Sequence, residues 1–100
     1  MKSITSNNEQ LKVFCQKNYI KKLSLFGSYL KNEQKENSDI DLLVEFKEHH
    51  TPGYLYLSRM ENDLSQLLNG KKVDLKTYSE LSRYFREDIL KMAVTQYDEQ

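Results

Sequence analysis

The sequence predicts an α/β (α+β) fold, in which a small mixed sheet of three or slightly more strands is flanked by about four helices. Short apolar runs bounded by polar or turn-forming residues predict buried strands at 23–26 and 42–46, and Lys71-Lys72-Val73-Asp74-Leu75-Lys76 predicts a third short strand. Apolar residues spaced three or four positions apart predict helices before, between and after these strands. Because 100 residues leave room for one hydrophobic core, we expect a single domain over residues 1–100.

The first predicted helix begins at a capping box, in which Ser6 is the N-cap and Glu9 reaches back toward it. The apolar residues that follow lie on one helical face: Leu11, Phe14, Cys15 and Tyr19. We therefore expect Cys15 in the core and not at a nucleophilic site, since no histidine lies near it in sequence to activate it. It is the only cysteine, so no intrachain disulfide can form, which favours a cytoplasmic location.

The first two predicted strands are antiparallel, because too few residues separate them for a parallel crossover. Gly27-Ser28 ends the first strand, and Asp39-Ile40-Asp41 opens the second after ten intervening residues. An antiparallel pairing brings the glycine-serine turn alongside the two aspartates. Because strand side chains alternate between faces, Asp39 and Asp41 should project together while Ile40 points the opposite way.

The second and third strands should be parallel, since the span between them contains a helix and suits a right-handed βαβ crossover. The predicted helix stops at Asn69-Gly70, and its apolar stripe comprises Leu57, Met60, Leu64, Leu67 and Leu68. Asp74 lies near the start of the third strand. In this register a third carboxylate joins Asp39 and Asp41.

The last third of the chain predicts one more helix. Thr77 and Glu80 fit a second capping box. The inner face of the helix would then comprise Leu81, Phe85, Ile89 and Met92. We expect Tyr97–Gln100 to fray.

Three carboxylates beside a glycine-serine turn indicate metal-assisted phosphoryl or nucleotidyl transfer. Neighbouring carboxylates repel one another, and a divalent cation such as Mg²⁺ with oxygen ligands relieves the repulsion. Gly27 permits close backbone approach to a phosphate, and Ser28 adds a hydroxyl. Two acids would hold Mg²⁺ against a triphosphate, and the third would share a second ion or take a proton from the attacking hydroxyl. The structural alternative is ordinary turn chemistry with solvated aspartates.

Charge and hydropathy exclude several classes of function. Lys+Arg and Asp+Glu number 15 each, so the net charge is zero, which argues against direct nucleic-acid binding. No apolar run approaches the ~18 residues that a membrane span needs. The adjacent His49 and His50 precede Thr51-Pro52-Gly53 and are interpreted as a solvated loop, because sequence neighbours rarely converge on one metal ion.

These motifs resemble the DNA polymerase β-like nucleotidyltransferase superfamily, and most of all its smallest branch, the minimal nucleotidyltransferases (MNT). The resemblance rests on Gly27-Ser28, ten residues, Asp39-Ile40-Asp41-Leu42-Leu43-Val44, and later Val73-Asp74-Leu75. It implies the nucleotidyltransferase fold.

The resemblance also implies the roles of the site residues. Gly27 and Ser28 would bind the nucleotide phosphates, and Asp39, Asp41 and Asp74 would be the catalytic and metal-binding acids. Many members follow Gly-Ser with x-Ala-Arg-Gly, whereas this chain has Tyr29-Leu30-Lys31-Asn32. Lys31 would still contact the nucleotide, although it lacks the bidentate fork of arginine.

The function that the resemblance implies is that of an antitoxin. Such a protein transfers AMP from ATP to a tyrosine hydroxyl of a HEPN ribonuclease toxin encoded nearby, with one or two Mg²⁺ ions as cofactors. Two alternatives stay open: an antitoxin that blocks the HEPN toxin by contact alone, and a transferase acting on a small molecule. Homo-oligomer formation is open too, and Tyr54, Tyr56 and Tyr84 are candidate partner contacts if they are exposed.

Overall fold

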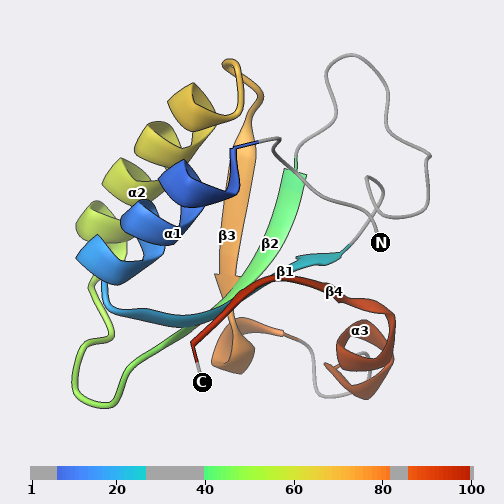
Figure 1. Ribbon diagram of the computed structural model, residues 1–100. Coiled ribbons are helices and arrows are strands. Elements are labelled where there is room, and N and C mark those ends of the chain that lie inside the picture. The colour runs from blue at the N-terminus through green and yellow to red at the C-terminus, as the bar shows by residue number, and fades with distance from the viewer. Residues whose placement is uncertain (1–6, 27–39, 82–85, 100) are drawn as a thin grey trace.

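The structure is a computed structural model that describes residues 7–26, 40–81 and 86–99 (Figure 1). Helices and strands follow one another in this order: α1 (Asn8–Lys17), β1 (Ile20–Phe26), β2 (Ile40–Phe46), α2 (Tyr54–Leu67), β3 (Val73–Thr77), the 3₁₀ helix η1 (Tyr78–Glu80), α3 (Arg86–Met92) and β4 (Val94–Asp98). The predicted α/β class with a small mixed sheet is confirmed. No helix in these ranges is both long and apolar enough to cross a bilayer.

The sheet has the strand order β3-β2-β1-β4. β1 is antiparallel to both of its neighbours, β2 and β4, whereas β2 and β3 are parallel. Both predicted pairings are therefore confirmed. The chain passes from β2 to β3 through α2, as a parallel connection requires.

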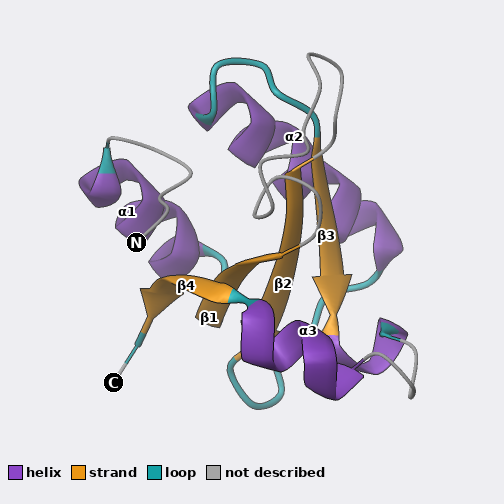
Figure 2. Ribbon diagram, turned by 90° about the vertical axis from the view of Figure 1, so that its right-hand side faces the viewer, coloured by secondary structure: helices purple, strands orange, loops and turns teal. Residues whose placement is uncertain are grey.

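Two helices cover one face of the sheet. In Figures 1 and 2, α1 and α2 lie on the same side of the strands, and α3 lies apart from both. The core between these helices and the sheet includes Leu11, Phe14, Cys15, Ile20, Leu23, Leu25, Ile40, Leu42, Val44, Leu57, Met60, Leu64, Val73 and Leu75. Since side chains alternate along a strand, the intervening residues of β2 and β3 lie on the opposite face.

The first helix differs from the prediction at both of its ends. Its N-cap is Asn7, one residue after the predicted Ser6, and the Asn7 side chain accepts a hydrogen bond from Gln10 N at 3.1 Å. Tyr19 was predicted on the buried face, but α1 ends at Lys17 and Tyr19 has a φ of 57°. The left-handed backbone turns Tyr19 outward, where it is 50% exposed and stacks on His50.

The last third of the chain also differs from the prediction. The capping box of Thr77 and Glu80 is present, but it caps the short helix η1 and α3 begins only at Arg86. Met92, predicted to face inward, is 47% exposed, and Leu81 is buried ahead of α3, while Phe85 lies outside the described residues.

The predicted frayed end is wrong for Tyr97 and Asp98, which belong to β4, while Gln100 lies outside the described residues. Tyr97 pairs with Leu23 of β1 and packs against the core.

Candidate active site

Two of the three predicted acids lie side by side on neighbouring strands. In the parallel register of β2 and β3, Asp41 is the direct partner of Asp74. Adjacent strands run about 4.8 Å apart, so two side chains in this relation can contact one ion. Both residues are half-buried, on the face of the sheet opposite α1 and α2. The pairing brings together acids that α2 separates in the sequence.

The buried residues just before each acid explain this placement. Ile40 is 1% exposed and Val73 is 5% exposed, and the two are partners in the register of β2 and β3. Ile40 N also donates to Lys72 O at 2.8 Å. Since Ile40 and Val73 anchor the starts of their strands in the core, strand alternation directs Asp41 and Asp74 to the opposite face.

The other predicted site residues fall outside the described part of the chain. These are Gly27, Ser28, Lys31 and Asp39. In sequence, Gly27 follows the last residue of β1, Phe26, which is the partner of Asp41 in the antiparallel register. Asp39 directly precedes Ile40. Their predicted roles therefore stay predictions.

The carboxylate oxygens of Asp41 and Asp74 are suitable ligands for a hard divalent cation. Carboxylate oxygens are the ligands that Mg²⁺ prefers, and it commonly takes one or two of them together with substrate phosphates. Among the described residues, no group of three or more His, Cys, Asp or Glu could hold a metal ion. The described strands thus contribute the pair Asp41 and Asp74, and Asp39 is the candidate for a third ligand.

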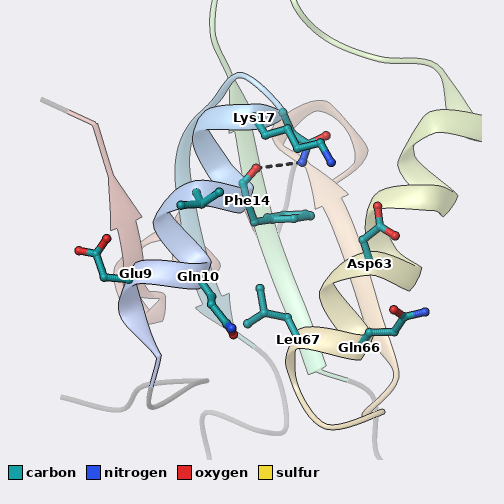
Figure 3. A pocket seen from close by; sticks show the side chains of 9 residues that line it. Glu9, Gln10, Phe14, Lys17, Asp63, Gln66 and Leu67 are labelled. Carbon is teal, nitrogen blue, oxygen red and sulfur yellow. Dashed lines mark hydrogen bonds between the residues drawn. The ribbon is translucent and has the colours of Figure 1, made fainter.

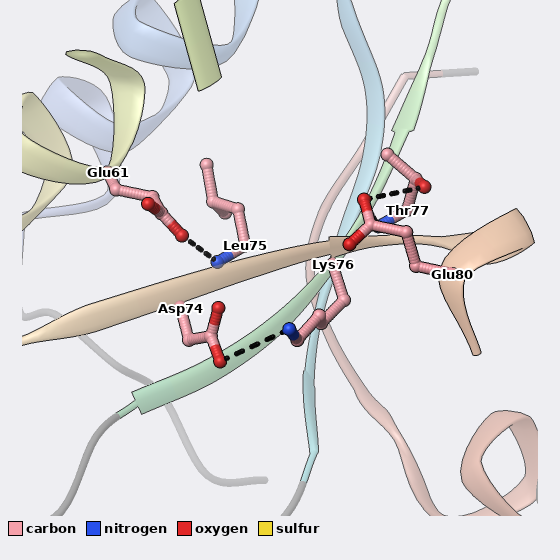
Figure 4. Close-up of polar contacts among 6 residues, drawn as sticks. All are labelled: Glu61, Asp74, Leu75, Lys76, Thr77 and Glu80. Atoms are coloured by element: carbon pink, nitrogen blue, oxygen red, sulfur yellow. Dashed lines mark hydrogen bonds and ion pairs between the residues drawn. The ribbon is translucent and has the colours of Figure 1, made fainter. Parts of the chain in front are cut away.

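A lysine beside the acids was not singled out in the sequence. Lys76 lies two residues after Asp74 on β3, and its Nζ lies 3.6 Å from Asp74 Oδ2 (Figure 4). Their side chains are 41% and 35% exposed. The i, i+2 spacing in a predicted strand was the available signal, because such residues share one face.

Helix α2 holds the outer edge of β3. Glu61 Oε2 accepts a hydrogen bond from Leu75 N at 2.7 Å, on the opposite side of β3 from Asp74 and Lys76 in Figure 4. β3 is an edge strand, so this backbone N–H has no neighbouring strand to bind. The contact occupies that donor and fixes the strand that carries Asp74.

The cysteine and the histidines behave as the sequence predicts. Cys15 is fully buried, and burial raises the pKa of its thiol to about 12, which keeps it protonated and unreactive. His49 and His50 are both exposed in the loop after β2.

A groove lies between α1 and α2, away from the acids (Figure 3). It has a volume of about 660 Å³, with Phe14 and Leu67 as apolar surface. Its polar lining includes Glu9, Lys17 and Asp63. Neither Asp41 nor Asp74, the two predicted site residues that the structure describes, lines it.

Comparison with known proteins identifies the group to which this chain is similar. A family model described as "Nucleotidyltransferase domain" matches residues 8–95. A protein of Methanocaldococcus jannaschii named "Putative protein adenylyltransferase MJ0435" is 46% identical over 78 residues, which cover 78% of this chain and 81% of that protein. The protein adenylyltransferase MntA of Thermococcus cleftensis is 37% identical over 75 residues, covering 75% of this chain and 73% of the relative.

Solved structures share the fold. A toxin–antitoxin crystal structure with AMP-PNP superposes with a TM-score of 0.73 at 23% identity, covering 94% of this chain and 75% of that one. A complex of an MNT antitoxin with a tri-AMPylated HEPN toxin of Shewanella oneidensis gives a TM-score of 0.65 at 19% identity, covering 93% and 71%.

Proposed function

Because this chain belongs to the nucleotidyltransferase domain family, we propose that it is a Mg²⁺-dependent antitoxin that transfers AMP from ATP to a tyrosine hydroxyl of a HEPN toxin. The observation that carries the proposal is the direct pairing of Asp41 with Asp74. Relatives named as protein adenylyltransferases support AMP transfer to a protein. The neighbouring structures, which contain AMP-PNP or an AMPylated HEPN toxin, suggest the nucleotide and the partner.

The acids and the glycine-serine turn have different proposed roles. Asp39, Asp41 and Asp74 would hold one or two Mg²⁺ ions, which when bound neutralise charge on the triphosphate. Gly27 and Ser28 would bind its phosphates. The third predicted nucleotide contact is Lys31.

The transfer itself needs one base and one leaving group. The tyrosine oxygen attacks the α-phosphorus of ATP, the bond to pyrophosphate breaks, and Asp74 takes the hydroxyl proton. Asp74 is 35% exposed at its side chain, so it can receive a proton at the surface of the sheet.

The relatives named as protein adenylyltransferases favour a protein acceptor over a small molecule. Asp41 and Asp74 are half-buried on one face of the sheet. Tyr54 and Tyr56 are 80% and 45% exposed, and they remain candidate contacts for the partner protein. Tyr84 lies outside the described residues.

Intact-mass spectrometry of the HEPN protein encoded nearby tests this function. We expect whole AMP units to be added after incubation with this protein, ATP and Mg²⁺, and no addition with Asp41→Asn or Asp74→Asn. Asp63→Asn is the matched control, because Asp63 is an exposed acid of α2 that lines the groove away from the site. An unchanged mass in a complex that still silences the toxin would instead establish inhibition by contact.

A further inference from the structure

Lys76 places a positive charge against one of the two paired acids. Its Nζ lies 3.6 Å from Asp74 Oδ2, and the two side chains share one face of β3. In the register of β2 and β3, Lys76 is the partner of Leu43, two positions along from the pair Asp41 and Asp74. The lysine therefore belongs to the same surface as the acids.

A lysine at this position changes the electrostatics of the site. Two carboxylates on neighbouring strands repel each other, and the Lys76 ammonium offsets part of that repulsion. A divalent cation would meet the same carboxylate that the ammonium contacts. The metal and Lys76 are thus competitors for Asp74.

The triphosphate of a nucleotide provides an alternative partner for the displaced lysine. A lysine ammonium is a compact charge on a flexible four-carbon stem, which can turn from a carboxylate to a nearby phosphate. Lys76 and Asp74 are both partly exposed, so little packing opposes this movement.

We propose that Lys76 is a positioning residue that pairs with Asp74 in the nucleotide-free protein and turns to the nucleotide phosphates when a metal ion binds Asp74. The inference rests on the proposed function, because it takes Asp41 and Asp74 as metal ligands. Its consequence is coupling: the lysine weakens metal binding to the empty site, and the nucleotide removes that competition. Coupling between two ligands is reciprocal, so metal must strengthen nucleotide binding by the same factor.

The test measures binding of Mn²⁺ to the full chain, by electron paramagnetic resonance, without nucleotide and with AMP-PNP. We expect Lys76→Met to bind Mn²⁺ about three- to ten-fold more tightly than the unaltered protein without nucleotide, as loss of one nearby exposed charge predicts. The further tightening caused by AMP-PNP should shrink in the variant. Lys76→Arg, which keeps the charge, should restore both properties toward those of the unaltered protein.

Lys47→Met is the matched control for net charge. Lys47 follows the far end of β2, and its Nζ pairs with Glu99 at 3.0 Å. The Lys47→Met variant also loses one charge and one ion pair, but both lie away from the acids. Equal effects of Lys47→Met and Lys76→Met, or no tightening in Lys76→Met, would overturn the inference.

Asp74→Asn separates this inference from the proposed function. Loss of Mn²⁺ binding in Asp74→Asn, together with unchanged affinity in Lys76→Met, overturns only the role of Lys76. Unchanged Mn²⁺ binding in Asp74→Asn would overturn the proposed metal site itself, and the role of Lys76 with it. A thermal melt of each variant establishes that it is folded.

Discussion

Asp41 and Asp74 owe their positions to the buried residues that precede them. Ile40 and Val73 are held in the core, and each acid is the next residue along its strand. A side chain placed in this way does not need contacts of its own to stay on the correct face. We therefore expect the charge of each acid to serve activity more than stability.

Asp41→Asn should separate the two properties. We expect AMP transfer to fall by about 100-fold or more, because the amide is a poorer metal ligand than the carboxylate. The variant should still fold, because the buried Ile40 anchors this end of β2 in the core. Mass spectrometry and a thermal melt measure both quantities. A variant that transfers AMP at the original rate would contradict the metal role.

Cys15 gives the folded protein a pH dependence at alkaline pH. Its thiol pKa is raised from 9.0 to about 12 by burial, so the folded chain keeps the proton where the unfolded chain loses it. The stabilisation is fully present below pH 9 and is lost as the pH rises from 9 toward 12.

Urea unfolding at pH 8 and 10.5 checks this pH dependence. Between these values the unaltered protein should lose about 2 kcal/mol more unfolding free energy than Cys15→Ala, since each pKa unit corresponds to about 1.4 kcal/mol. Other titrating groups are common to both proteins and cancel in the difference. Equal losses of unfolding free energy in the unaltered protein and in Cys15→Ala would show that the Cys15 thiol has an ordinary pKa.

At the scale of elements, the hydrogen bond between Glu61 of α2 and Leu75 of β3 holds the strand that carries Asp74. Glu61→Ala should leave Leu75 N without its partner and destabilise the fold by about 1–3 kcal/mol. Glu61→Gln keeps an acceptor oxygen and should lose less. Hydrogen exchange at the Leu75 amide reports the contact directly, and it should speed up in Glu61→Ala. An equal exchange rate at the Leu75 amide in Glu61→Ala and in the unaltered protein would mean that this hydrogen bond does not stabilise β3.

Elements with strong local signals were predictable from the sequence, and those that depend on distant partners were not. β1 and β2 contain short apolar runs and β3 alternates buried Val73 and Leu75 with polar residues, so the three strands were predictable, and the placement of Asp74 beside Asp41 followed from spacing and connection length. β4 was missed because its residues are at most half-buried and it is stabilised by pairing with β1. Among the described candidate residues, Lys76 was overlooked because an ion pair depends on side-chain position as well as on strand register.

For the whole molecule, ligand binding and folding are linked. A ligand that binds only the folded state stabilises it by about 2.7 kcal/mol at a concentration of 100 Kd. For a 100-residue domain this should raise the melting temperature by about 10 °C or more. We expect such a rise with AMP-PNP and Mg²⁺ together, and a much smaller one in Asp41→Asn. A rise of the same size in the variant would argue for a nucleotide site elsewhere.

The parallel pairing of β2 with β3 has a consequence for the order of events during folding. Asp41 and Asp74 become neighbours only after α2 has crossed over and the two strands have met. Contacts between residues so distant in sequence close late, because the loop entropy must be overcome first. A newly made or partly unfolded chain therefore has no acid pair to present to a nucleotide. The proposed transferase would become active only after β2 and β3 have paired.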